Sequence, residues 1–122
     1  VTLIGAGLML SRCLQAADTL AAEGIDARVL EIHTIKPLDV EAVANAARET
    51  GALVTAEEHS IIGGLGAAVA EAVTDTCPVP VKRVGLADRF AETGPYEAIL
   101  ERYGMSVAAV VTAARAAIAA KA

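Results

Sequence analysis

Residues 57–66 read Glu57-Glu58-His59-Ser60-Ile61-Ile62-Gly63-Gly64-Leu65-Gly66, and they join the apolar run 53–56 to a segment of helical period. Two carboxylates and a histidine stand at the predicted end of a strand, and three glycines open the next helix. No other part of the chain combines two adjacent carboxylates, a histidine and three glycines within ten residues. We therefore expect any site or working interface of this chain to include the 57–66 segment.

The sequence on either side of this segment alternates between predicted strands and predicted helices. Apolar runs predict strands at residues 1–4, 27–32, 53–56 and 81–86. Apolar residues at three- and four-residue steps predict helices at about 10–23 and 40–50, and one with Leu65, Val69, Ala72 and Val73 on one face. A short helix is predicted after Pro95 and a last one after Ser106. This alternation is typical of a parallel sheet covered by helices on both faces. We predict a three-layer α/β/α fold.

The predicted sheet is mostly parallel, with four strands in the order 2-1-3-4. Right-handed crossovers between the strands lead to a doubly wound arrangement. Four strands are few for such a sheet, so a further edge strand before Val1 is an open alternative.

Capping residues mark the expected helix ends. Asp39 and Ser106 are suited to accept a hydrogen bond from the first turn of the helix that follows each of them. Gly24, Gly51 and Gly104 are suited to end helices, since glycine adopts the left-handed backbone conformation without strain.

The length and the first residue bear on domain organisation. A chain of 122 residues is long enough for one domain with its own core. It begins with Val1 instead of Met and enters a predicted strand directly. We expect residues 1–122 to be a single domain cut from a longer chain.

Composition excludes several classes of partner. The formal net charge is −5, and the Lys and Arg residues are scattered singly, so no basic patch for nucleic acid or an anionic membrane is visible. No apolar run reaches the length of a membrane span. Cys13 and Cys77 fall in predicted helical segments without metal-type spacing, and we expect buried free thiols and a cytoplasmic location.

Two glycine clusters are candidate anion sites. Gly5-Ala6-Gly7 follows the first strand like a dinucleotide fingerprint, but Leu10 occupies the third glycine position, so a tight turn is the simpler interpretation. The glycines at 63–66 open a helix, whose free N–H groups attract anions. Glu57 and Glu58 can instead occupy that helix end themselves, and the sequence leaves both alternatives open.

The histidines give no readable catalytic or metal site. His59 could act as a general base, but its only nucleophile nearby is Ser60, its direct neighbour. His33 stands beside Thr34 at the end of the second strand, and the simplest interpretation is a loop histidine without a catalytic role. No H-x-x-x-H or C-x-x-C pair supports a metal centre.

A polar loop follows the fourth predicted strand. Its charged residues Asp88, Arg89 and Glu92 are suited either to a local salt-bridge cluster or to a contact with a partner. The sequence does not choose between these two roles.

Fold logic gives a location for function. In open α/β sheets, ligands bind beside the carboxyl ends of the strands where the strand order reverses. With the order 2-1-3-4, that crevice lies between the turn at 5–7 and the acidic residues at 57–59. Residue chemistry alone therefore predicts a place but no reaction.

Four motifs along the chain carry a family resemblance. They are residues 2–7 (TLIGAG), residues 33–39 (HTIKPLD), the 57–66 segment, and a final stretch with Asp88-Arg89-Phe90, Gly94, Leu100 and Tyr103-Gly104-Met105. In this order they resemble the C-terminal domain of transketolase-type, thiamine-diphosphate-dependent enzymes. Related domains occur in 1-deoxyxylulose-5-phosphate synthases and in the β subunits of 2-oxoacid dehydrogenases, and these are alternative parents.

The resemblance implies a role within a larger enzyme. A transketolase transfers a two-carbon ketol unit between sugar phosphates in carbohydrate metabolism, with thiamine diphosphate and a divalent metal such as Mg²⁺. In this family other domains hold the cofactor, and the C-terminal domain serves assembly. The resemblance thus implies no catalytic, cofactor-binding or metal residue here, and an isolated fragment without activity. Its implied partners are the remaining transketolase domains or a second subunit, in a homodimer or heterotetramer.

The 57–66 segment is then a candidate domain interface, formed by Glu57, Glu58, His59, Ile61, Ile62, Gly63, Gly64 and Gly66. Exposed apolar side chains at Ile61 and Ile62 would suit a partner surface. The competing hypothesis from another class is a flavodoxin-like module that binds a small anion or nucleotide at the same place.

Overall fold

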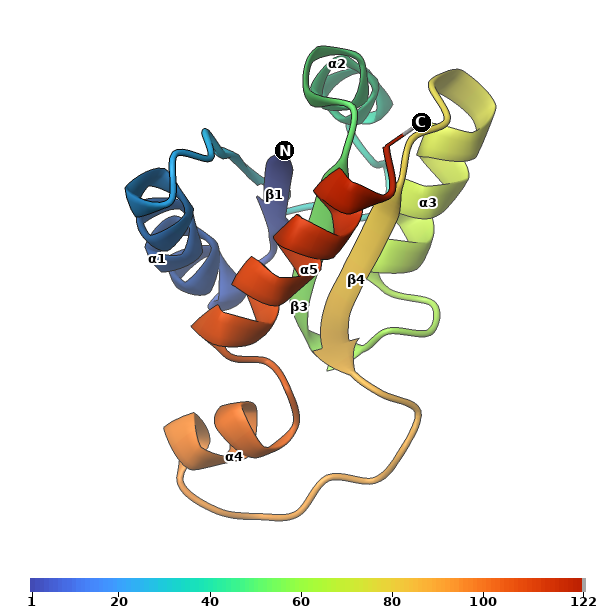
Figure 1. Cartoon of the computed structure of the whole chain (residues 1–122). Helices are drawn as coiled ribbons and strands as arrows, with labels where there is room; N and C mark the ends of the chain where they lie inside the picture. The colour runs from blue at the N-terminus through green and yellow to red at the C-terminus, as the bar shows by residue number, and fades with distance from the viewer. Residues whose placement is uncertain (122) are drawn as a thin grey trace.

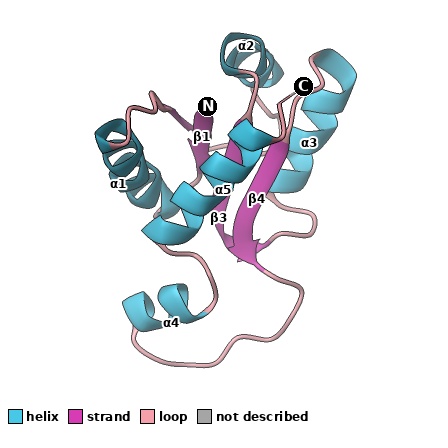
Figure 2. Ribbon diagram, viewed as in Figure 1, coloured by secondary structure: helices cyan, strands magenta, loops and turns pink. Residues whose placement is uncertain are grey.

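The computed structural model describes residues 1–121. Strands and helices alternate along the chain before two helices end it (Figures 1 and 2). The elements are β1 (Thr2–Gly5), α1 (Met9–Ala22), β2 (Arg28–Glu31), α2 (Val40–Thr50), β3 (Leu53–Ser60), α3 (Leu65–Thr76), β4 (Val81–Leu86), α4 (Tyr96–Arg102) and α5 (Val107–Ala119).

The four strands form one sheet in the order β2-β1-β3-β4, and every neighbouring pair is parallel. The register aligns Leu3 of β1 with Val29 of β2 and with Val54 of β3. The predicted fold class and strand order are therefore confirmed.

Helices cover both faces of this sheet (Figure 1). Successive strand residues point to opposite faces, so Leu3 joins the core under α1 and α5, and Ile4 joins the core under α2 and α3. Leu20 and Val110 lie in the first core, whereas Val69 lies in the second. Alanine supplies much of both cores, which lets the helices pack closely on the strands.

The predicted caps are present. Asp39 Oδ1 accepts a hydrogen bond from the backbone N–H of Ala42 at 2.9 Å, and Ser106 Oγ accepts one from Ala109 at 3.1 Å. Gly51 ends α2 with a φ of 69°, in the left-handed region that glycine favours.

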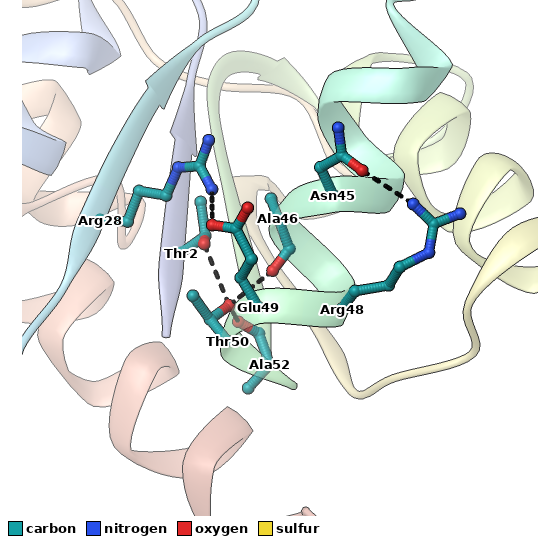
Figure 3. Close-up of polar contacts among 8 residues, drawn as sticks. All are labelled: Thr2, Arg28, Asn45, Ala46, Arg48, Glu49, Thr50 and Ala52. Atoms are coloured by element: carbon teal, nitrogen blue, oxygen red, sulfur yellow. Dashed lines mark hydrogen bonds and ion pairs between the residues drawn. The ribbon is translucent and has the colours of Figure 1, made fainter.

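Polar side chains at the amino end of the sheet are paired with one another (Figure 3). The Thr50 hydroxyl lies 3.0 Å from the buried Thr2 hydroxyl and also bonds the carbonyls of Ala46 and Ala52. Arg28 of β2 forms an ion pair with Glu49 of α2. These contacts join α2 to the amino ends of the strands, and the candidate site lies at their carboxyl ends.

Two expectations need correction. The third strand does not end at residue 56 but continues to Ser60, because an irregularity after Ala56 lets Ser60 pair with Leu86 of β4. The acidic residues and the histidine of the 57–66 segment thus belong to β3. Cys77 is half-buried and caps the end of α3 instead of lying inside it, whereas Cys13 is fully buried and burial raises the pKa of its thiol to about 12.

The polar loop after β4 projects from the body of the domain together with α4 (Figure 1). Every residue from 87 to 98 is exposed, and Leu100 is the buried residue of α4. Among the described residues, no helix is both long and apolar enough to cross a membrane.

Candidate functional site

A pocket opens at the carboxyl ends of β1 and β3, where the strand order reverses. Its volume is about 320 Å³, and it is lined by Ala6, Gly7, Ile35, Glu57, Glu58, His59, Gly63, Gly64 and Leu65. The crevice predicted between the first glycine turn and the acidic residues is therefore present.

Glu57 is the buried polar group of this site, with an exposed fraction of 4%. Its Oε1 accepts the backbone N–H of Leu65 and its Oε2 accepts that of Gly66, each at 2.8 Å. The residue that caps α3, Gly64, has no side chain to do this. A carboxylate from the neighbouring strand thus occupies the helix end that would otherwise attract an anion.

Gly64 is required by this arrangement. A Cβ at Gly64 would lie 2.0 Å from Glu57 Oε1. Gly85 of β4 plays a similar part, since a Cβ there would lie 2.8 Å from the carbonyl oxygen of His59, where β3 bulges. Glycine at these positions therefore allows the close approach of Glu57 to α3 and of β4 to β3.

His59 and Ser60 do not form a catalytic pair. The His59 imidazole is mostly exposed, and its Nδ1 lies 2.9 Å from the Ser60 carbonyl oxygen and 3.7 Å from Glu57 Oε1. The Ser60 hydroxyl accepts the backbone N–H of Ile62 at 3.2 Å. The side chain of Ser60 thus shapes the turn and is not activated by the histidine.

Ile61 and Ile62 differ in exposure. Ile62 has an exposed fraction of 59%, whereas Ile61 is half-buried and its carbonyl accepts a hydrogen bond from Arg83 Nη1 at 3.0 Å. Gly63 between Ile62 and the helix has a φ of 74° and open space around it. Ile62 is therefore the apolar side chain that this segment presents to solvent.

The first glycine cluster is explained by packing. A Cβ at Gly5 would lie 2.9 Å from the Cα of Leu10, so glycine there lets α1 approach the end of β1. Gly7 has a φ of 55°, which places it in a turn that favours glycine. Both features fit the tight-turn interpretation.

The remaining charged candidates lie outside the pocket. His33 is exposed, and its Nδ1 lies 2.7 Å from the Thr34 hydroxyl. Glu92 pairs with Arg102 at 2.9 Å, and the Arg89 guanidinium lies 4.8 Å from the centre of the Tyr103 ring. Within residues 1–121, no group of three or more His, Cys, Asp or Glu side chains could hold a metal ion.

A contact that the sequence did not reveal joins the pocket to α4. The Tyr96 hydroxyl donates a hydrogen bond to Glu58 Oε2 at 2.5 Å. This hydrogen bond to a carboxylate raises the pKa of Tyr96 to about 12. The two residues are far apart in the chain, and no local pattern indicates that they meet.

We expect the pKa of Tyr96 to be measurable, because the chain has two tyrosines and replacing Tyr103 leaves Tyr96 as the single one. In a Tyr103→Phe variant, the phenolate absorbance at 295 nm should rise with a midpoint near pH 12. The hydrogen bond favours the neutral phenol, so its stabilisation is full below the ordinary pKa of about 10 and is lost as the pH rises through the folded value.

Glu58→Gln in the same background is the control, since it removes the charge that holds the phenol proton. It should move the midpoint down toward the ordinary tyrosine value. An unchanged midpoint in the Gln variant would show that Glu58 is not the cause.

The parallel 2-1-3-4 sheet, with helices on both faces, defines a doubly wound α/β domain, and the Glu57 carboxylate occupies the start of α3 beside its switch point. The chain belongs to the transketolase C-terminal domain family, whose sequence pattern matches residues 1–110.

Curated relatives agree with this membership. The chain is 48% identical over 114 residues to the 6-deoxy-6-sulfo-D-fructose transketolase subunit SqwH of a Clostridium species. This match covers 93% of this chain and 35% of that subunit. It is 42% identical over 123 residues to 1-deoxy-D-xylulose-5-phosphate synthase 1 of Geobacter sulfurreducens, which covers 99% of this chain and 19% of that synthase.

A solved structure agrees as well. A split-gene transketolase, solved as an inactive beta4 tetramer, superposes with a TM-score of 0.96 and 48% identity, over 99% of this chain and 40% of that chain. This chain thus spans about a third or less of the length of the curated relatives named above.

Proposed function

We propose that this chain is the C-terminal domain of a transketolase that transfers a two-carbon ketol unit between sugar phosphates. The parent enzyme would use thiamine diphosphate and a divalent metal such as Mg²⁺. The observation that carries the proposal is the match of residues 1–110 to the family, together with transketolase relatives at 48% identity.

The residues present do not fit the cofactor. A diphosphate placed at the start of α3 would meet the Glu57 carboxylate, which already takes the N–H groups of Leu65 and Gly66. The negative charges of the Glu57 carboxylate and of a diphosphate at the start of α3 would repel each other, so this site disfavours the anion. We therefore propose that the start of α3 holds no cofactor phosphate, and we assign no catalytic, cofactor-binding or metal residue to this domain.

The role that the geometry supports is assembly. We assign the candidate interface to the 57–66 segment, with Ile62 as its exposed apolar residue. The partner would be the remaining transketolase domains or a second subunit, within a homodimer or heterotetramer. Two free cysteines fit a cytoplasmic enzyme.

The function is tested by assaying the complete enzyme that contains this chain. We expect ketol transfer between sugar phosphates that requires thiamine diphosphate, and no transfer by residues 1–122 alone. Transfer by the fragment, or a complete enzyme that acts without thiamine diphosphate, would contradict the proposal.

A second candidate rests on the relative at 42% identity. The parent could be a 1-deoxy-D-xylulose-5-phosphate synthase, since such a synthase matches 99% of this chain. Formation of 1-deoxyxylulose 5-phosphate by the complete enzyme, without ketol transfer between sugar phosphates, would favour this candidate. The anion-binding module gains no support, because Glu57 occupies its site.

Replacing Ile62 with serine tests the interface. In the complete enzyme we expect association with the partner to weaken about tenfold or more, because an apolar side chain at the centre of an interface can contribute over 1 kcal/mol. Sedimentation at several protein concentrations measures this association when the partner is a second subunit. In a single-chain enzyme, thermal unfolding measures how strongly this domain is held by the others.

Leu14→Ser is the matched control, because Leu14 is exposed to a similar extent but lies on α1 away from the pocket. It should leave association unchanged. Equal effects of the two substitutions would remove the 57–66 segment from the interface.

A further inference from the structure

The segment between β4 and α4, residues 87–95, is here termed the arm. All of its residues are exposed, and it reaches outward from the carboxyl end of the sheet before the chain returns through α4 (Figure 1). Phe90 lies within it with an exposed fraction of 101%, so its ring is as open to solvent as in an extended chain. It is the one phenylalanine of the sequence.

The arm is held by specific contacts at its base. The backbone N–H of Glu92 donates to the Tyr103 hydroxyl at 2.9 Å, and the Glu92 carboxylate pairs with Arg102 at 2.9 Å. The Arg89 guanidinium lies over the Tyr103 ring. These contacts fix the arm without drawing Phe90 onto its own domain.

Phe90 is not an isolated exposed side chain. Among the described residues, the exposed large apolar side chains are Leu8, Leu14, Ile35, Val40, Ile62, Phe90 and Tyr96. All except Leu14 lie in the segments that follow the carboxyl ends of the strands, or in the first residue of a helix there. Exposed apolar residues gathered on one edge of a domain indicate an interaction surface.

The chemistry around Phe90 fits a protein partner. Its neighbours Asp88 and Arg89 carry opposite charges, and Glu92 adds a negative one. An aromatic residue with a mixed charged rim is typical of the centre and border of a protein interface. The absence of a cationic cluster in the arm, and the net charge of −5, disfavour a nucleic acid or an anionic membrane.

The arm is continuous with the 57–66 segment, because Tyr96 at the start of α4 donates its hydroxyl proton to Glu58 of that segment. A partner seated on Ile62 would therefore extend toward the arm. The match to this chain covers only 35% of the SqwH subunit. Most of such a polypeptide therefore lies outside this domain and is available to cover the arm and the 57–66 segment.

We propose that the arm docks on the part of the parent polypeptide that lies outside this domain, with Phe90 inserted into an apolar pocket there. This rests on the proposed function, because it takes the partner from the transketolase parent. It extends the interface from the 57–66 segment to a second, separate element.

Trypsin cleavage after Arg89 in the complete enzyme tests the docking, since cleavage there needs an open arm. Cleavage in the wild-type enzyme should be slow, and Phe90→Ser should accelerate it about tenfold or more, the loss expected of an aromatic anchor. Phe90→Leu should restore much of the protection, and Leu14→Ser should cleave like wild type. Equal cleavage rates for wild type and Phe90→Ser would overturn the proposal.

A photo-crosslinking residue at position 90 identifies the occupant. Cross-links to peptides outside residues 1–122 support the proposal, whereas cross-links to residues 1–122 of a second copy overturn the choice of partner. If no cross-link forms at all, the docking proposal is overturned. Neither readout depends on catalysis, so an enzyme without ketol transfer but with a protected arm would contradict only the proposed function.

Discussion

Replacing Glu57 with alanine is expected to lower the free energy of unfolding of this domain by about 3 kcal/mol or more. Each hydrogen bond to a charged group contributes roughly 1.5–3 kcal/mol, and Glu57 accepts one from Leu65 and one from Gly66. Its removal leaves both N–H groups buried without a partner at the start of α3, since Gly64 offers no side chain in exchange. Urea unfolding followed by circular dichroism measures the change.

Glu58→Ala is the matched control, because Glu58 is the adjacent carboxylate but is exposed. It loses one surface contact, the hydrogen bond from Tyr96, and should cost about 1 kcal/mol or less. If the two substitutions cost the same, Glu57 is not the cap of α3 and the description of the pocket floor is wrong.

Replacing Gly64 with alanine is expected to cost about 2 kcal/mol or more, because overpacking in a filled site is destabilising. The added Cβ would lie 2.0 Å from Glu57 Oε1, so the carboxylate or the helix end must move. Gly63→Ala is the neighbouring control. It has open space around it, so it should cost only the strain of its left-handed backbone, about 1 kcal/mol.

A double-mutant cycle separates this steric effect from a general one. In the Glu57→Ala background the nearest obstacle is gone and only His59 Nδ1, 3.1 Å from the added Cβ, remains close, so Gly64→Ala should cost less than it does in the wild type. Additive costs would show that Gly64 is needed for a reason other than the Glu57 carboxylate.

Most of the fold could be predicted from the sequence because each element carries a local signal. The apolar runs of β1 and β3, the cap at Asp39 and the helix-ending Gly51 act within a few residues of themselves. The strand order 2-1-3-4 was a hypothesis, because right-handed crossovers restrict the possible orders without determining one. The end of β3 could not be predicted in this way, because it depends on pairing between Ser60 and Leu86 across a bulge.

The candidate site was located by the sequence but not described by it. The predicted crevice is present, and Glu57 does occupy the helix end, one of two alternatives that the sequence left open. The hydrogen bond between Tyr96 and Glu58 and the full exposure of Phe90 could not be foreseen, because both depend on how the arm leaves the sheet. Tertiary geometry, not local pattern, decides such contacts.

The 57–66 segment has the composition of an active-site loop, with two carboxylates, a histidine and three glycines. Its geometry assigns most of these residues to structure: Glu57 caps α3, Gly64 makes room for it, and Ser60 holds the turn. What it leaves on the surface is Ile62, Glu58 and His59, which suit contact with a neighbouring domain.

The central claim is that this domain belongs to a thiamine-dependent enzyme without holding its cofactor. Isothermal titration of thiamine diphosphate with Mg²⁺ into residues 1–122, and in parallel into the complete enzyme, tests it most directly. We predict saturable binding by the complete enzyme and no saturable heat with residues 1–122. Saturable binding by residues 1–122 alone, lost on replacing Gly64 with a bulky residue, would contradict the account.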